Sequence, residues 1–181
     1  YYPVFMDIKN KNCLVVGGGR VGARKAATLL RCGAIVTVVS LELSSAFDQL
    51  PPASLTLKKK AYEPADVSGM FFVFAATDDV TLNQAVKQDA ARLDILCNIA
   101  DNPDQSDFIL PSIVQRGDLI LGISTGGRSP AAAKRIRKEL EHYFGEEYGP
   151  FLTFMGNLRE ELLASGHAPD AHKKIFHMLM D

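Results

Sequence analysis

The chain has 181 residues, with 20 Lys and Arg against 21 Asp and Glu and a formal net charge of −1. Its hydrophobic content of 47% and charged content of 23% are those of a globular protein. The near-neutral charge excludes a global attraction to nucleic acid or to a membrane surface. No apolar run approaches the roughly 20 residues of a membrane-spanning helix. We therefore expect neither nucleic acid nor membrane as a partner.

The three cysteines, Cys13, Cys32 and Cys97, are odd in number and far apart. This spacing predicts reduced, buried packing residues rather than a disulfide or metal set. The first five residues lack the basic region and apolar segment of a signal peptide. No initiator methionine is present, so a few leading residues are expected to be missing. These features predict a cytoplasmic protein.

Predicted strands and helices alternate through the first hundred residues, which is typical of a parallel sheet with helices on both faces. The apolar runs predict strands over residues 12–16, 35–39, 55–59, 70–75 and 95–99. The helical segments between them are predicted over 21–31, near 44–50 and over 80–92. The expected fold class is α/β, a Rossmann-type doubly wound parallel sheet.

The pattern changes after Asp101. Apolar runs over 108–115 and 119–124 flank Arg116-Gly117-Asp118, which predicts a β-hairpin. Ser129 is the expected N-cap of a helix that has Pro130 at its first position and ends near Phe144.

Two glycine positions are expected to break the chain after this helix: Gly145 and the Gly149-Pro150 pair. Helices are predicted beyond them, over 151–165 and 170–180. The chain therefore divides into a dinucleotide-binding domain (1–112), a dimerisation hairpin with its helix (113–147) and a short helical domain (148–181).

The strongest motif is Gly17-x-Gly19-x-x-Gly22, which follows an apolar strand and opens a helix. In a dinucleotide-binding turn, Gly17 takes the tight turn, Gly19 lets the backbone approach a pyrophosphate, and Gly22 lets the helix approach the strand. The helix N-terminus then offers N–H groups and partial positive charge to phosphates. The alternative is a glycine-rich turn without a ligand.

Further cofactor-binding candidates lie at the carboxyl ends of the next strands. The second strand ends at Ser40, and Glu42 is a slightly late acid for the ribose hydroxyls. No Arg or Lys follows the strand there to meet a 2′-phosphate, so NAD is favoured over NADP. The alternative for Glu42 is a solvated loop acid. Later strands deliver Ala76, Thr77 and Asn98 to the same edge, whereas Asp78 or Asp79 is better interpreted as a helix cap.

Asp101 is the candidate catalytic acid or base. It follows an apolar strand at the edge where the cofactor would bind, and burial there raises a carboxyl pKa. The alternative is a turn-forming Asp near Pro103.

The Gly126-Gly127 turn opens a helix and forms a second candidate anion site. The helix carries Lys134 and Arg135, a basic group that would suit a polycarboxylate ligand. A solvated helix face is the alternative. The histidines lack the spacing of metal ligands, so no metal site is expected.

With these segments in order, the chain resembles the amino-terminal module of siroheme synthase and the related precorrin-2 dehydrogenases. The matching motifs are the Val15–Val21 glycine turn with Arg24-Lys25, Ala75-Ala76-Thr77-Asp78-Asp79, Cys97-Asn98-Ile99-Ala100-Asp101, Phe108-Ile109-Leu110-Pro111-Ser112 and Ser124-Thr125-Gly126-Gly127-Arg128-Ser129-Pro130. The resemblance implies NAD-dependent oxidation of precorrin-2 to sirohydrochlorin in a homodimer. In some members the same site also inserts ferrous iron.

The resemblance also implies roles for single residues. Cofactor contacts fall on Gly19, Arg20, Val21, Leu41 and Glu42, and the essential carboxylate falls on Asp101. The carboxylate-rich tetrapyrrole would be held by cations and a helix N-terminus. The substrate-binding candidates are Thr125, Gly126, Gly127, Arg128, Lys134, Arg135 and His142.

Two other functions stay open at this point. A non-catalytic NAD-sensing module would need the glycine turn but no placed acid. It would not explain the second glycine turn and its cations. A different small-molecule dehydrogenase would need its own substrate domain, and the chain after Asp101 leaves little room for one.

Overall fold

The structure is a computed structural model that describes residues 1–100 and 102–164. The chain forms two compact units, Tyr1–Ile109 and Leu110–Asp181. Among the helices of the described residues, none combines the length and apolar character needed to span a membrane.

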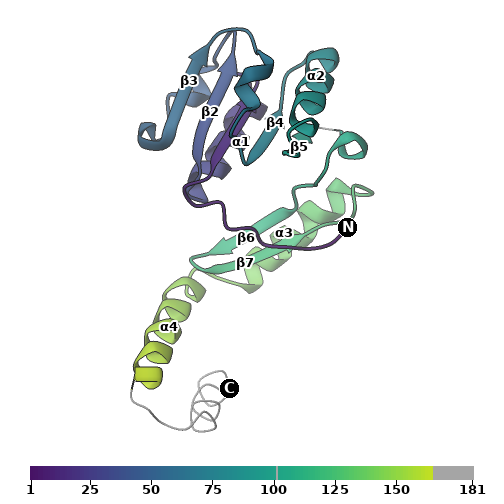
Figure 1. Ribbon diagram of the computed structural model, residues 1–181. Helices are drawn as coiled ribbons and strands as arrows, with labels where there is room; N and C mark the ends of the chain where they lie inside the picture. The colour runs from purple at the N-terminus through teal and green to yellow at the C-terminus, as the bar shows by residue number, and fades with distance from the viewer. Residues whose placement is uncertain (101, 165–181) are drawn as a thin grey trace. The chain divides into compact units, whose positions relative to one another are not determined.

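The first unit is a five-stranded sheet in the order β3-β2-β1-β4-β5, in which every neighbouring pair is parallel (Figure 1). Its strands are β1 (Asn12–Val16), β2 (Ile35–Ser40), β3 (Leu55–Lys59), β4 (Phe72–Ala75) and β5 (Leu96–Ile99). Its α-helices are α1 (Arg20–Arg31) and α2 (Val80–Ala91). This strand order confirms the predicted Rossmann-type α/β class. The segment predicted as a short helix near 44–50 contains only a 3₁₀ turn, Ser45–Phe47.

The sheet is buried on both faces, which explains why its central strands are continuous apolar runs. Side chains alternate along each strand. Val15 and Val38 therefore pack in one cluster with Ala26 of α1, whereas Val16 and Val39 pack in a second cluster that includes residues of α2.

The cysteine prediction is partly wrong. Cys13 and Cys97 are buried free thiols, as expected, but Cys32 is exposed. Cys32 is the C-cap of α1 and lies beyond Leu29, the last buried residue of the helix. Burial raises the pKa of both buried thiols, Cys13 and Cys97, to about 11. These two cysteines are therefore protonated packing residues at neutral pH.

The second unit is an antiparallel hairpin followed by two helices. The hairpin joins β6 (Ser112–Arg116) to β7 (Leu119–Ile123) through Gly117, which has φ +56°. The helices are α3 (Pro130–Tyr143) and α4 (Tyr148–Ala164). The Ser129 hydroxyl accepts a hydrogen bond from the Ala132 N–H at 3.2 Å, which confirms the predicted N-cap.

Strand β6 begins four residues later than the predicted run 108–115, at Ser112. Phe108 instead packs in the core of the first unit, where its ring centroid lies 5.0 Å from that of Phe72. Pro111, which has no N–H to donate to a strand partner, precedes the new start. The predicted run is therefore divided: Phe108 belongs to the core of the first unit, and the residues from Ser112 onward form the hairpin of the second unit.

The predicted break at Gly149-Pro150 is also wrong. Both residues lie in the first turn of α4, which begins at Tyr148. Proline is tolerated there because N–H groups of the first turn have no helical partner. The break comes earlier, after α3, where Arg116 donates to the carbonyl oxygens of Glu141 (3.2 Å) and Phe144 (3.1 Å). The predicted helix over 170–180 lies outside the described residues.

Candidate functional site

The glycine turn between β1 and α1 is too tight for side chains at its ends. Gly17 has φ +126°, and a Cβ there would lie 2.3 Å from the carbonyl oxygen of Ala76. A Cβ at Gly22 would lie 2.1 Å from the carbonyl oxygen of Gly17. These two glycines therefore bring α1 and the end of β4 against the turn, as a dinucleotide-binding turn requires.

Gly18 is a third required glycine that the motif did not single out. A Cβ on Gly18 would lie 1.8 Å from the carbonyl oxygen of Glu42 and 2.8 Å from Oγ of Ser40. The Gly18 carbonyl also accepts a hydrogen bond from the Ser44 N–H at 2.8 Å. The segment that follows β2 is thus held directly against the glycine turn. In the sequence, the uninterrupted run Gly17-Gly18-Gly19 was the signal that could have identified Gly18 as a required glycine.

The residues at the start of α1 fit a pyrophosphate. Gly19, the N-cap, has no atom within 4 Å of an added Cβ, so space is open at this point of the turn. The helix has no side-chain cap and no acid in its first turn, and Arg20 is exposed. The first N–H groups, including that of Val21, are therefore available to an anion.

The segment after β2 is exposed toward solvent. Leu41 is 66% exposed, and Glu42 is exposed as well, whereas Ser40 is partly buried. The Glu42 backbone is fixed against Gly18, which places this residue beside the turn that would hold the cofactor. This position suits the ribose hydroxyls.

The end of β4 is held by a side chain that sequence analysis missed. Asn83 of α2 donates from Nδ2 to the Thr77 carbonyl at 2.9 Å and accepts from the Thr77 hydroxyl at 2.8 Å. Asp79 accepts from the N–H groups of Thr81 (2.8 Å) and Leu82 (3.1 Å), which confirms its interpretation as a helix cap. Ala76 and Thr77 are therefore fixed at the strand end.

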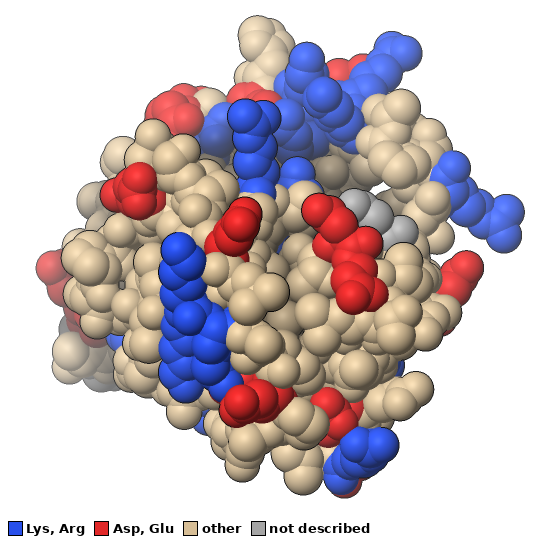
Figure 2. Space-filling model, turned by 90° about the horizontal axis from the view of Figure 1, so that it is seen from above, with Lys and Arg blue, Asp and Glu red and all other residues tan. Residues whose placement is uncertain are grey.

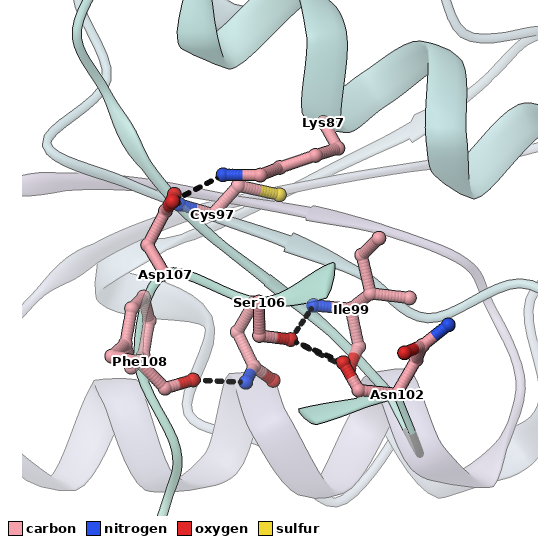
Figure 3. A network of polar contacts seen from close by, with 8 residues as sticks. Lys87, Cys97, Ile99, Asn102, Ser106, Asp107 and Phe108 are labelled. Carbon is pink, nitrogen blue, oxygen red and sulfur yellow. Dashed lines mark hydrogen bonds and ion pairs between the residues drawn. The ribbon is translucent and has the colours of Figure 1, made fainter. Parts of the chain in front are cut away.

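The end of β5 is tied to the loop that follows it (Figure 3). The Cys97 N–H donates to Asp107 at 2.8 Å, and the Ile99 N–H donates to the Ser106 hydroxyl at 2.9 Å. Asn98, predicted as a cofactor contact, donates from its side chain to the Phe108 carbonyl at 2.9 Å. The amide of Asn98 thus holds the returning loop.

Lys87 of α2 forms an ion pair with Asp107 across this loop. Burial by itself raises the pKa of Asp107. Hydrogen bonds from Lys87 and the Cys97 N–H, together with the lysine charge, lower the pKa by more than burial raises it, so the pKa lies below its usual value. Asp107 is therefore ionised at neutral pH and anchors the loop electrostatically.

Asp101, the candidate catalytic residue, lies outside the described residues. The residues on either side of it are held by backbone hydrogen bonds. The Ala100 N–H donates to the Ala75 carbonyl at 2.8 Å, and the Asn102 N–H donates to the Ile99 carbonyl at 3.3 Å. Ala100 and Asn102 are thus attached to the carboxyl ends of β4 and β5.

In the second unit, a separate glycine turn precedes α3. Gly126 and Gly127 have φ +61° and +81°, so both adopt the left-handed conformation that favours glycine. The Thr125 hydroxyl donates to the Ser129 carbonyl at 3.1 Å and accepts from the Ser129 N–H at 3.2 Å. This pair of hydrogen bonds closes the loop, and it leaves Arg128 exposed beside the N-terminus of α3.

The cations of α3 differ in their pairing. Arg135 is paired with Glu139 at 2.9 Å, whereas Lys134 takes part in no ion pair with the described residues. Both side chains are exposed, as is His142 in the last turn. Figure 2 shows Lys and Arg side chains next to Asp and Glu side chains over the visible face, as the near-neutral net charge leads one to expect.

No group of three or more His, Cys, Asp or Glu side chains in the part of the chain that the structure describes could hold a metal ion.

Two family models match the chain, one in each unit. A family model described as putative NAD(P)-binding matches residues 4–112, and one described as sirohaem biosynthesis protein, central, matches residues 116–143. The first unit is thus an NAD(P)-binding domain.

The curated relatives are longer than this chain. A siroheme synthase of Nitrosomonas eutropha is 41% identical over 164 residues, which are 90% of this chain and 34% of the relative. Siroheme synthase 2 of Yersinia enterocolitica is 38% identical over 90% of this chain and 34% of its own length. The chain therefore spans about a third of the length of these relatives.

A solved structure matches over almost its whole length. SirC, a precorrin-2 dehydrogenase, superimposes with a TM-score of 0.83 at 30% identity, over 100% of this chain and 90% of that one. The order of the motifs, the two family models and this match agree with one another. The chain belongs to the family of precorrin-2 dehydrogenases and the amino-terminal modules of siroheme synthases.

Proposed function

We propose that this chain is an NAD-dependent precorrin-2 dehydrogenase that produces sirohydrochlorin. The observation that carries the proposal is the match to SirC, because it spans all of this chain and nearly all of that protein. The open glycine turn supports it, since Gly19 and the uncapped start of α1 leave the pyrophosphate position accessible.

The proposed cofactor site lies on the first unit. NAD supplies a hydride acceptor when bound. Gly17, Gly19 and Gly22 shape the turn, the first N–H groups of α1 bind the phosphates, and Glu42 binds the ribose hydroxyls. The fixed ends of β4 and β5 line the edge where parallel sheets bind ligands.

The oxidation transfers a hydride to the nicotinamide and a proton to a base. We assign the proton to Asp101, which follows β5 at the edge where the dinucleotide binds. The backbone hydrogen bonds of Ala100 and Asn102 restrict the neighbours of this carboxylate. The ion pair of Lys87 with Asp107 supports the same loop from its other end.

We further propose that the second unit binds the carboxylates of the tetrapyrrole. Gly126, Gly127 and the N-terminus of α3 form an anion-binding turn, and Arg128 and Lys134 add exposed positive charge. Arg135 is a weaker candidate because Glu139 already neutralises it.

A homodimer is part of the proposal, through the hairpin of the second unit. A two-stranded sheet is marginally stable by itself, and β6 and β7 pair only with each other among the described strands. Ile113 and Ile120, on the face opposite buried Val114, are each 41% exposed. A second copy would cover them. We also propose a cytoplasmic location, which the three free cysteines support.

The experiment is to mix the purified protein with precorrin-2 and NAD and to follow sirohydrochlorin absorbance, with NAD omitted as control. NAD-dependent product supports the dehydrogenase. Dinucleotide binding without product would identify a non-catalytic NAD-sensing module instead. Adding ferrous iron tests the second activity, with iron as a substrate: conversion to sirohaem would make the enzyme bifunctional.

A further inference from the structure

The sheet brings lysines next to the position where a dinucleotide ribose binds. The parallel register places Lys59 of β3 opposite Ser40 at the end of β2. The Lys60 N–H donates to the Ser40 carbonyl at 3.0 Å, so the pairing continues to the strand ends. In the sequence these lysines lie far from Ser40, and only strand pairing makes them neighbours.

Lys59 and Ser40 project on the same side of the sheet. Neighbouring residues in parallel register share a face, and side chains alternate along each strand. Val38 and Leu55 belong to the cluster under α1, and Ser40 and Lys59 continue this face to the sheet edge. Oγ of Ser40 lies 2.8 Å from the position of a Cβ on Gly18, so this is the side of the glycine turn.

The neighbouring lysines are placed differently. Lys58 pairs with Val39 in register and therefore projects from the opposite face. Lys60 is already bound, with Nζ at 3.0 Å from Glu63 and 2.9 Å from Asp66. Lys59 is exposed and takes part in no ion pair with any residue that the structure describes.

These positions suit one extra phosphate. The residue at the end of β2 meets the ribose 2′-position, where an acid repels a 2′-phosphate and a nearby cation accommodates it. Here that residue is Ser40, whose hydroxyl can donate a hydrogen bond to phosphate. Lys59 supplies a point charge of the kind that binds phosphate. Glu42 is exposed, and its atoms nearest to a Cβ on Gly18 belong to the backbone, so the carboxylate can bind the ribose hydroxyls of NAD or turn toward solvent when a 2′-phosphate is present.

We propose that Ser40 and Lys59 form a subsite for the 2′-phosphate of NADP, so that this protein accepts NADP as well as NAD. The inference rests on the proposed dinucleotide site. It extends the sequence argument for NAD, which considered only residues that follow Ser40 along the chain. The competing explanation is that the lysines protect β3, an edge strand, against pairing with another chain.

The test is calorimetric titration of the full chain with NAD, NADP, and the pair AMP and adenosine 2′,5′-bisphosphate, which differ only in the 2′-phosphate. The variants are Lys59→Ala and, as a matched control from the same strand and the opposite face, Lys58→Ala. We expect NADP to bind within about tenfold of NAD. Lys59→Ala should weaken NADP and the bisphosphate about tenfold and leave NAD and AMP within twofold, as for loss of one charged hydrogen bond. Lys58→Ala should change none of the four more than twofold.

If the wild-type protein binds NAD but binds NADP at least a hundredfold more weakly, the subsite is overturned and the proposed function stays intact. Equal effects of the two substitutions on NADP would also overturn it and would favour edge protection or general electrostatics. Failure of both dinucleotides to bind would overturn the proposed function and the subsite together.

Discussion

The two units of this chain bury their apolar residues to very different extents. In the first unit both faces of the sheet are covered, and core residues such as Leu14, Val36 and Val73 are fully buried. In the described part of the second unit, residues 110–164, the buried apolar residues are Val114 and Ala133. A unit that buries a large apolar area can fold by itself, whereas one that does not needs another surface. We therefore expect the first unit to fold by itself and the second unit to depend on contact with another surface.

The largest expected effect comes from separating the units. A fragment of residues 1–109 should unfold cooperatively and bind NAD, because its core is complete. A fragment of residues 110–181 should show concentration-dependent folding. Circular dichroism and calorimetry over a hundredfold range of concentration would measure both. If the fragment of residues 110–181 folds as a monomer at every concentration, the expectation that the second unit depends on assembly is wrong.

Asp101→Asn should separate the chemistry from the folding of the first unit. We expect turnover to fall about 10²- to 10⁴-fold, the usual contribution of a general acid or base. The NAD dissociation constant and the thermal midpoint should stay near the wild-type values. Steady-state assays and calorimetry would test this. Unchanged turnover would remove Asp101 from the mechanism.

Two substitutions in the glycine turn should separate packing from cofactor binding. Gly18→Ala places a Cβ 1.8 Å from the Glu42 carbonyl oxygen and should lower the free energy of unfolding by about 1–3 kcal/mol. Gly19→Ala is the matched control, because nothing lies within 4 Å of its Cβ. It should leave stability unchanged and weaken NAD binding. Denaturant titration with and without NAD would distinguish them, and equal stability of both variants would contradict the tight contact at Gly18.

Ile120→Lys tests whether the second unit depends on assembly with a second copy. If a second copy covers the outer face of the hairpin, the charge should weaken the dimer by about 1.5–3 kcal/mol, the value of a buried apolar side chain. Ile35→Lys is a matched control in the first unit, since Ile35 is 42% exposed and Ile120 is 41% exposed. Analytical ultracentrifugation would measure both. Equal dissociation of the two variants would argue against a dimer through the hairpin.

The smallest effect is expected from the loop anchor of the first unit. The pKa of Asp107 is lower in the folded protein than in the unfolded chain, so the ionised form stabilises the fold. This contribution is complete above the unfolded pKa of about 4 and is lost as the pH falls through the folded value. Asp107→Asn should cost about 1 kcal/mol at pH 7, a small value because Asp107 is partly exposed. Urea titrations at pH 7 and pH 3 would show the two proteins converging in acid, and a constant difference would contradict the assignment.

Local signals in the sequence were reliable where the structure depends on neighbours along the chain. The runs 12–16 and 55–59 form the predicted strands, and Asp79 and Ser129 cap the predicted helices. Strand propensity, capping and tight glycine turns are properties of a few adjacent residues, and so they can be inferred before the fold is known. The roles of the individual cofactor and substrate residues stay predictions.

By itself, then, the sequence determined the α/β class, the glycine turn and the family resemblance, because each rests on a short pattern or on an ordered series of them. Tertiary structure alone decided which of these residues meet. It showed that Gly18 lies against the segment after β2 and that Lys59 lies beside Ser40. It also showed that the Asn98 side chain donates a hydrogen bond to the loop at Phe108. None of these contacts is between adjacent residues of the chain, so they depend on how the chain folds back on itself. For Lys59 and Ser40, the pairing of β2 with β3 sets the register.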